Sequence, residues 1–355
     1  MKEIFFKANQ YLFFIVLTVV VMHFGAPFLI PIVFAALLSM LMAPACRKFE
    51  SWGFNRAFAT ISCILILLVV CAGVVFIVST QLSTFLENIS EIQARGKELL
   101  GNIQSYIQEH VGITPEKQEA IVREQAQTSS QASGSMLTKL LKGLTSTITA
   151  MVLTLVVTFL MIYNKEQFQS FFLRLFADKD TERVKMITEQ ITNVSQHYLT
   201  GRAMSVMIDA TLYSIGLLIV GVKNAILLGC IASMLTVIPY VGTVLGGLMP
   251  VTMALLTQDV QTALWAALVL LVIQTIDNYF IEPNVVGGQV NLSALSSILG
   301  ILLGGMIWGV AGMILFLPLL GIIKIICDHV QELKPVGYLL GEPVASSGTS
   351  TAHNS

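Results

Sequence analysis

Long apolar runs follow one another along the chain and decide its predicted fold. A helix needs about 20 apolar residues to cross the roughly 30 Å hydrocarbon layer of a membrane. Within that layer a helix satisfies all of its own backbone hydrogen-bonding groups. Runs near this length predict six transmembrane helices, over residues 8–24, 28–45, 57–80, 144–163, 203–222 and 262–281.

Two further apolar blocks, over residues 224–257 and 291–327, are interrupted by glycine and proline. Each block is too short for two spans with a loop and too long for one span. We therefore predict a re-entrant helical hairpin for each block, entering the membrane from opposite sides. The predicted fold class is all-α, a polytopic transmembrane helical bundle with about eight membrane segments including these two opposed hairpins.

A polar stretch over residues 81–142 separates the third and fourth predicted spans. Apolar residues from Leu82 to Ile107 recur at alternating spacings of three and four, which predicts an amphipathic helix. The segment from Glu124 to Ser135 has a loop-like composition. We interpret the helix as packed on the extramembrane surface of its own protein, with a dedicated partner-binding helix as the alternative.

Lys and Arg cluster in alternate connections, which places those connections in the cytoplasm. The N-terminus, the loops 46–56 and 164–202 and the C-terminal tail are predicted to be cytoplasmic, and the polar stretch extracytoplasmic. The predicted divisions are helices one to three (1–80), the extracytoplasmic segment (81–142), the fourth helix with a cytoplasmic amphipathic segment (143–202), a transport core (203–328) and a tail with a disordered end (329–355).

The composition excludes several classes of protein. Hydrophobic residues make up 55% and charged residues 12% of the chain, whereas soluble domains are about a quarter charged. The mean hydropathy is +0.79. A formal net charge of −1 gives no basic excess for binding nucleic acid. The sequence has no GxxxxGK[ST] phosphate loop and no HExxH motif, so we predict no enzyme activity, no cofactor and no metal.

The five cysteines form no CxxC pair and lie mostly in apolar runs. We interpret them as small packing or lipid-facing residues, without a disulfide framework or a zinc site. They are Cys46, Cys63, Cys71, Cys230 and Cys327.

Ionisable side chains inside a span are costly and mark candidate functional positions. Asp209 lies about two turns into one predicted span, and Asp277 lies far along the next. Helical spacing puts Gln274, Asp277, Asn278 and Glu282 on one face, which we expect to face the protein interior. This face would carry protons or a cation, or line a path for a polar solute. In the alternative, the Glu-Pro-Asn sequence at 282–284 ends the helix at the cytoplasmic interface and Asp277 reaches the headgroups.

The breaks in the two apolar blocks are the candidate substrate site. Gly- and Pro-interrupted hydrophobic segments in paired positions are the best sequence pointer to a transport site. The alternative is close helix packing through small residues. The predicted site is the meeting of Pro239, Gly242, Gly246 and Gly247 with Gly304, Gly305 and Gly309.

Three long segments resemble the autoinducer-2 exporter family of bacterial membrane proteins. They are LTVIPYVGTVLGGLMPVTMALL (235–256), QTIDNYFIEPNVVGGQVNLSAL (274–295) and ILLGGMIWGVAGMILFLPLLGIIKII (301–326). The resemblance implies secondary transporters of about eight membrane segments that form homo-oligomers, pentamers among them. Some members export autoinducer-2, and others resemble sodium/proton antiporters.

The IPYVG motif of this family falls on residues 238–242, which adds Tyr240 to the candidate pathway. The acidic residue of the family's following helix falls on Asp277, and its Pro and Gly before the last block on Pro283 and Gly287. The chain departs from the family in three ways, which leave the substrate open. Thr243 stands where proline is common, Asp277 where glutamate is common, and Ser293-Ala294 where a His-Pro pair is common.

The leading hypothesis is a secondary transporter of the bacterial inner membrane that exports a small polar solute, with autoinducer-2 among the candidates. The alternative is a sodium/proton antiporter that uses Asp277 and Asp209. A non-transporting membrane scaffold or a membrane enzyme is the hypothesis from another class. The expected partners are the lipid bilayer, the small polar solute or a monovalent cation, and further copies of the chain.

Overall fold

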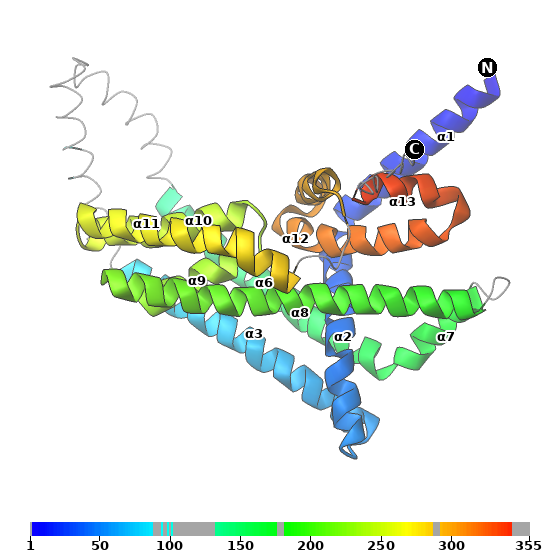
Figure 1. The fold of residues 1–355 in the computed structure, drawn as a ribbon, viewed down its shortest axis with the longest axis horizontal. Helices are drawn as coiled ribbons and strands as arrows, with labels where there is room; N and C mark the ends of the chain where they lie inside the picture. Colours follow the sequence, from blue (N-terminus) through cyan, green and yellow to red (C-terminus); the bar gives the residue numbers. More distant parts are fainter. Residues whose placement is uncertain are drawn as a thin grey trace, which may run out of the picture. The chain divides into compact units, whose positions relative to one another are not determined.

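The computed structural model describes residues 2–87, 94, 98, 101, 132–175, 181–286 and 292–342, and these are helical almost throughout (Figure 1). The described residues contain one isolated β-bridge, between Leu292 and Gly341. The all-α prediction is confirmed for this part of the chain. The amphipathic helix predicted from Leu82 to Ile107 and the predicted disordered tail lie largely outside the described residues.

Five of the six predicted spans fall inside an observed helical segment, and the span predicted over 203–222 overlaps α8, which ends at Val220. Several helix starts carry a side-chain cap, as where Asn55 and Ser293 accept hydrogen bonds from backbone N–H groups of the first turn. The helices are α1 (Lys2–Phe24), α2 (Ala26–Ser51), α3 (Arg56–Glu87), α6 (Ala132–Tyr163), α7 (Lys165–Leu175), α8 (Thr181–Val220), α9 (Ala225–Leu235), α10 (Val241–Thr257), α11 (Val260–Ile276), the π-helix η1 (Asp277–Val286), α12 (Ala294–His329), the 3-10 helix η2 (Gln331–Leu333) and α13 (Lys334–Leu340).

Five of these helical segments are long and apolar enough to cross a membrane. They are Ala26–Ser51, Arg56–Ile77, Glu182–Val220, Val260–Val286 and Ala294–His329, and a bent pair, Thr147–Tyr163 with Lys165–Phe171, makes a sixth candidate. Large hydrophobic side chains remain exposed along most of them, as expected for helices that face lipid. The chain is therefore a multi-pass membrane protein, while the predicted total of about eight segments stays a prediction.

Helix α8 is longer than the predicted span. It contains 40 residues without a proline, so it is about 60 Å long, twice the thickness of the hydrocarbon layer. Part of the helix must therefore lie outside the membrane. The connection expected before residue 203 is consequently helical from Thr181 onward.

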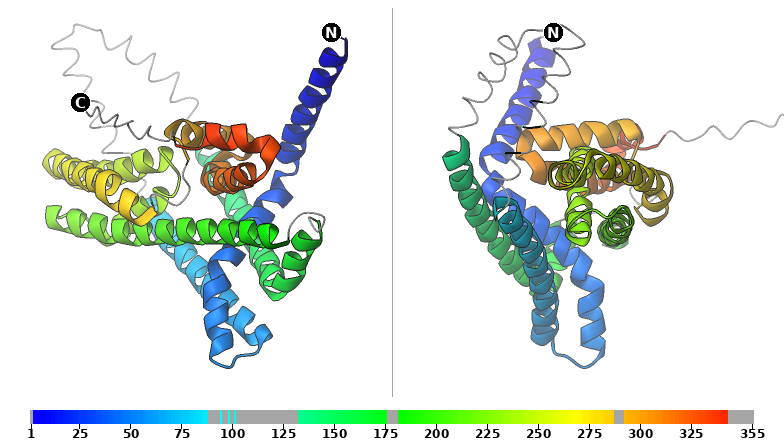
Figure 2. Two further views of the ribbon diagram at one scale, coloured as in Figure 1. Left: turned by 45° about the vertical axis from the view of Figure 1, so that its right-hand side comes forward. Right: turned by 90° about the vertical axis from the view of Figure 1, so that its left-hand side faces the viewer.

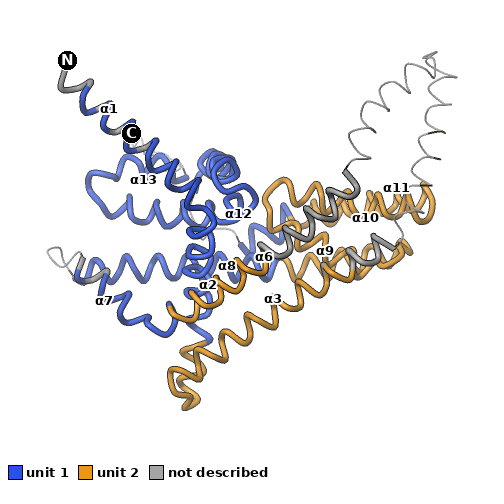
Figure 3. The backbone as a smooth tube through the Cα atoms, turned by 180° about the vertical axis from the view of Figure 1, so that it is seen from behind, with its two compact units in different colours: residues 1–45, 161–205, 278–355 blue, residues 46–160, 206–277 orange. Residues whose placement is uncertain are grey.

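The chain divides into two compact units, each assembled from separate stretches of sequence (Figure 3). Unit 1 contains residues 1–45, 161–205 and 278–355, and unit 2 contains residues 46–160 and 206–277. The core of unit 2 is formed by α8, α9, α10 and α11, with Leu217, Leu228 and Ala266 at its centre. Unit 1 has a smaller core around Leu37, Trp308 and Leu315.

The first interrupted block, in unit 2, is a pair of antiparallel helices, α9 and α10. Glycines of α10 lie directly against the α9 backbone: a Cβ on Gly246 would be 2.7 Å from the Ala232 carbonyl oxygen. Gly242 meets the Leu235 carbonyl in the same way. The two helices have 11 and 17 residues, shorter than the roughly 20 needed to span a membrane.

The second block, in unit 1, also folds back on itself (Figure 2). Helix α12 reverses at Gly309, whose φ of +60° and ψ of −138° are not helical. Its two arms then lie side by side, because Gly304 faces Gly312 and Gly300 faces Leu320. Both blocks are thus helical hairpins, and their entry into the membrane from opposite sides stays a prediction.

One expectation about the cysteines was wrong. Cys46 at the end of α2 and Cys63 on α3, both fully buried, form a disulfide. They are 17 residues apart, on consecutive helices joined by a short turn that brings them back alongside each other. Spacing in sequence did not reveal this pairing, because it depends on how two helices meet.

Candidate functional site

Two carboxylates are buried in the helices of unit 2. Asp209 on α8 is 0% exposed, and Asp277, at the junction of α11 and η1, is 3% exposed. Both belong to segments long and apolar enough to span a membrane. A charged group at the centre of a bilayer costs about 2.5–3.5 kcal/mol on insertion scales, so such groups pair, bind protons or line a polar path.

A close approach of α8 to α11 brings further polar groups to Asp277. A Cβ on Gly216 would lie 2.5 Å from Val269 Cγ1, so the absence of a side chain at 216 lets the helices touch. One turn earlier on α8, the Tyr213 hydroxyl donates a 2.9 Å hydrogen bond to Oε1 of Gln274 on α11. The Gln274 amide then donates to Oδ2 of Asp277 across 3.5 Å, which is a long hydrogen bond.

These hydrogen bonds join Tyr213, Gln274 and Asp277, and we call these three residues together with Asp209 the buried polar cluster. Asp209 lies four residues before Tyr213, so the two side chains share one face of α8. The hydroxyl–amide–carboxylate chain orients Gln274 with its N–H group towards Asp277. Two carboxylates buried among neutral hydrogen-bonding groups can take up a proton or hold a monovalent cation.

The expectation that Gln274, Asp277, Asn278 and Glu282 share one buried face was wrong for the last two. Asn278 is exposed, and the Glu282 side chain is 51% exposed. The cause is the π-helix from Asp277 to Val286, whose wider turn shifts the residues after Asp277 away from α-helical register.

Glu282 instead pairs with Arg202 of α8 within unit 1, at 3.6 Å between Nη1 and Oε1. Close packing of the same two segments is visible at Gly201, where a Cβ would lie 2.4 Å from the Val285 carbonyl oxygen. The alternative, in which the Glu-Pro-Asn sequence at 282–284 ends the helix at the cytoplasmic interface, stays a prediction; the described helix reaches Val286, two residues beyond Asn284.

The glycines of the predicted substrate site pack the hairpins internally. Gly242 and Gly246 hold α10 against α9, and Gly304 holds the two arms of α12 together. Gly305 faces the flexible Met313 side chain, whereas a Cβ on Gly247 would meet nothing within 4 Å. The first glycine set belongs to unit 2 and the second to unit 1, so their meeting at one site stays a prediction.

Pro239 and Tyr240 form the turn between α9 and α10. Tyr240 has a φ of +60° and a side chain that is 60% exposed. A bulky residue rarely adopts this conformation, and strained backbone of this kind clusters at ligand clamps and switch regions. Tyr240 therefore stays a candidate pathway residue.

Sequence reasoning missed Tyr213 and Arg202. Each lies on α8 and pairs with a residue that had been singled out, Tyr213 with Gln274 and Arg202 with Glu282. The spacing of four between Asp209 and Tyr213 was a usable signal, because it places a second polar group on the same helix face.

The apolar helices, the two broken hairpins and the buried carboxylates together define a multi-pass membrane protein of the transporter class. The family model described as the AI-2E family transporter matches residues 12–332. The chain belongs to this family of membrane transporters, which confirms the resemblance seen in the sequence.

Named relatives match over most of their length. YueF of Bacillus subtilis, named only for transport, is 27% identical over 320 residues, covering 85% of this chain and 84% of its own. The AI-2 transport protein TqsA of Escherichia coli K12 is 24% identical over 323 residues, covering 90% of this chain and 91% of its own. YhhT of the same strain, also named only for transport, is 21% identical over 320 residues, with 90% and 89% covered.

Proposed function

We propose that this chain is a secondary transporter of the bacterial inner membrane that exports a small polar solute, with its N- and C-termini in the cytoplasm. The observation that carries the proposal is the buried polar cluster, in which Asp209 and Asp277 are shielded inside candidate spans. The sequence has no phosphate loop for ATP. An ion gradient acting on these carboxylates is therefore the proposed source of energy.

The first solute to test is autoinducer-2, because the relative TqsA is named for its transport. The departures at Thr243, Asp277 and Ser293-Ala294 argue for testing other small polar solutes beside it. The exposed and strained Tyr240 and the open Gly247 are the proposed solute-facing positions of the first hairpin.

The decisive experiment is transport by purified protein in proteoliposomes under an imposed pH gradient. Asp277→Asn and Asp209→Asn should each lower gradient-driven efflux at least tenfold, because an amide cannot exchange a proton. Asp259→Asn is the matched control, since this exposed aspartate lies at the start of the same helix as Asp277 and asparagine also caps helices well. No movement of solute, proton or cation under any gradient would overturn the proposal.

Sodium/proton exchange is the second candidate function, and the two buried carboxylates favour it. In this case sodium pulses should move protons in vesicles that contain no solute. Asp277→Asn should abolish that movement, whereas Asp259→Asn should preserve it. A sodium response that both variants retain would exclude exchange through Asp277.

A further inference from the structure

The short helix α7 follows α6 after a sharp bend. Helix α6 ends at Tyr163 and α7 begins at Lys165, and the two apolar segments are bent by 73° at this break. Membrane-spanning helices tilt by about 20° on average. A helix bent this far from a span therefore lies closer to the plane of the membrane than to its normal.

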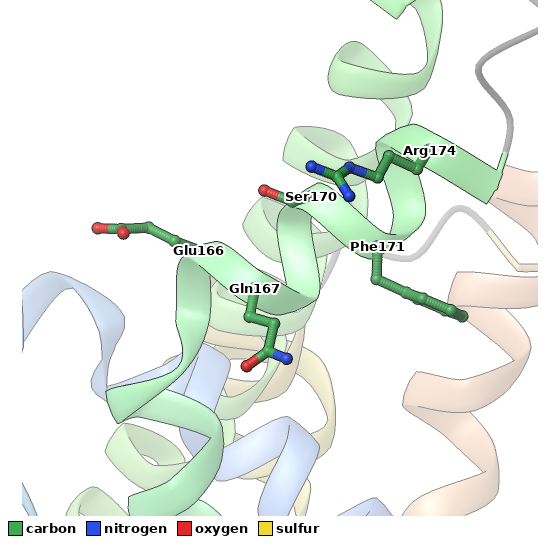
Figure 4. A pocket seen from close by; sticks show the side chains of 5 residues that line it. All are labelled: Glu166, Gln167, Ser170, Phe171 and Arg174. Atoms are coloured by element: carbon green, nitrogen blue, oxygen red, sulfur yellow. The ribbon is translucent and has the colours of Figure 1, made fainter.

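The sequence of α7 has one apolar and one polar face. Its phenylalanines and a leucine at positions 168, 171, 172 and 175 follow the spacing three, four and seven that defines one helix face. Glu166 and Ser170 lie on the opposite face, which carries one apolar residue, Leu173. Figure 4 shows Phe171 pointing away from both of them.

Neither the hydrocarbon core of the membrane nor bulk water is a favourable environment for α7. At 11 residues it is about 16 Å long, half the thickness of the hydrocarbon layer, and it has polar residues in every turn. Yet Phe168 is 44% exposed and Phe171 is 56% exposed, so these two side chains of the apolar face are left partly uncovered. The boundary between headgroups and acyl chains is the environment that suits both faces.

We propose that α7 is an interfacial helix that binds the phospholipid surface of the membrane. Phe168 and Phe171 insert at the level of the upper acyl chains, as aromatic side chains do at both membrane interfaces. The helix also borders a hollow of about 670 Å³, which is lined by the polar residues Glu166, Gln167, Ser170 and Arg174 and by Phe171 of the apolar face (Figure 4). The Arg174 guanidinium, exposed beside this hollow, donates hydrogen bonds to a lipid phosphate.

The test uses a nitroxide label on the full chain in nanodiscs of phosphatidylethanolamine and phosphatidylglycerol. Labels replace Phe168 or Phe171 on the apolar face, and Gln169 or Ser170 as matched positions on the polar face. The native cysteines are first replaced, in a background whose helical content and size-exclusion elution match those of the wild type. The measurement compares collision of each label with oxygen, which concentrates in lipid, and with a water-soluble nickel chelate.

We expect the labels at 168 and 171 to collide more with oxygen than with nickel, and those at 169 and 170 to show the reverse. Water-like accessibility at all four positions would overturn the proposal. Protection of 168 and 171 from both reagents would also overturn it, because it would show burial against protein, such as a second copy of this chain. The assay does not depend on which solute is transported, so its failure is distinguishable from failure of the proposed function.

Discussion

The indole N–H of Trp308 donates a 2.8 Å hydrogen bond to the backbone carbonyl of Met22. Met22 lies in the last turn of α1, where carbonyl groups have no partner within the helix. The exchange is reciprocal, because His23 Nδ1 lies 3.3 Å from the carbonyl oxygen of Ile307, next to the reversal of α12. Residues at the tip of the second hairpin and residues at the end of α1 therefore hydrogen-bond to each other's backbone carbonyls.

Replacing Trp308 with phenylalanine should weaken this joint. The ring still packs edge-on against Phe316, but the Met22 carbonyl loses its donor, at a cost of about 1–3 kcal/mol. Thermal unfolding of the purified protein in detergent should show a lower midpoint. Trp265→Phe is the control, since Trp265 is largely exposed. Equal midpoints for both variants would show that the Trp308 hydrogen bond adds no stability.

Removal of the Tyr213 hydroxyl should slow transport. Tyr213→Phe keeps the buried ring but removes the donor to Gln274, and with it the orientation of the amide towards Asp277. A loss of about 1–3 kcal/mol corresponds to a transport rate that is roughly 5- to 140-fold lower, at tenfold for each 1.4 kcal/mol. The initial rate in proteoliposomes measures this. Tyr279→Phe, at an exposed tyrosine, should match the wild type, and a wild-type rate for Tyr213→Phe would remove Tyr213 from the site.

Substitution by alanine should have opposite effects on stability at two neighbouring glycines of α10. Gly246→Ala places Cβ against the Ala232 carbonyl, so α9 and α10 must separate, at a cost of about 1–3 kcal/mol. Gly247→Ala meets open space and should raise stability by up to about 1 kcal/mol, because alanine favours helix. Unfolding midpoints in detergent check both. Similar midpoints would mean that α10 does not pack on α9 as described.

The Gly247→Ala variant also tests whether this position contributes to transport. If Gly247→Ala is stable but moves solute slowly, position 247 contacts the solute path. A wild-type rate would show that position 247 does not contact the solute path.

The start of α11 should give the protein a pH-dependent stability. The backbone N–H of Thr262 donates a 2.8 Å hydrogen bond to Asp259 Oδ1 and its hydroxyl a 2.9 Å bond to Oδ2, and the backbone bond in particular holds the pKa of Asp259 below its ordinary value. Because the folded-state pKa is depressed, this stabilisation is present above the unfolded-state pKa of about 3.9. It is lost as the pH falls through the folded-state pKa.

Thermal unfolding of the wild type and of Asp259→Asn, measured from neutral to acidic pH, tests this pH-dependent stabilisation. The wild type should be the more stable at neutral pH, and the difference should shrink as the pH falls below about 4. A constant difference across the range would show that the Asp259 charge does not contribute.

The six predicted spans and the two interrupted blocks followed from the sequence alone, because hydrophobic runs and helix breakers act locally. The same holds for Asp209 and Asp277, since a carboxylate in an apolar run stands out without any structure. Tertiary structure decided which groups meet them. Tyr213 reaches Gln274 only because Gly216 lets α8 approach α11, and no local pattern encodes that approach.

Tertiary structure likewise decided the role of the glycines and which of the four polar residues from Gln274 to Glu282 are buried. Gly246 contacts the backbone of α9, and Gly304 contacts the backbone of the other arm of α12. Sequence spacing alone could not distinguish this packing role from a substrate site. The π-helix turned Asn278 and Glu282 outward, although α-helical spacing had placed them with Asp277. Helix formation depends on neighbours along the chain, whereas packing and register depend on contacts between residues far apart in sequence. The sequence therefore determined the membrane helices, and the structure determined the cluster between them.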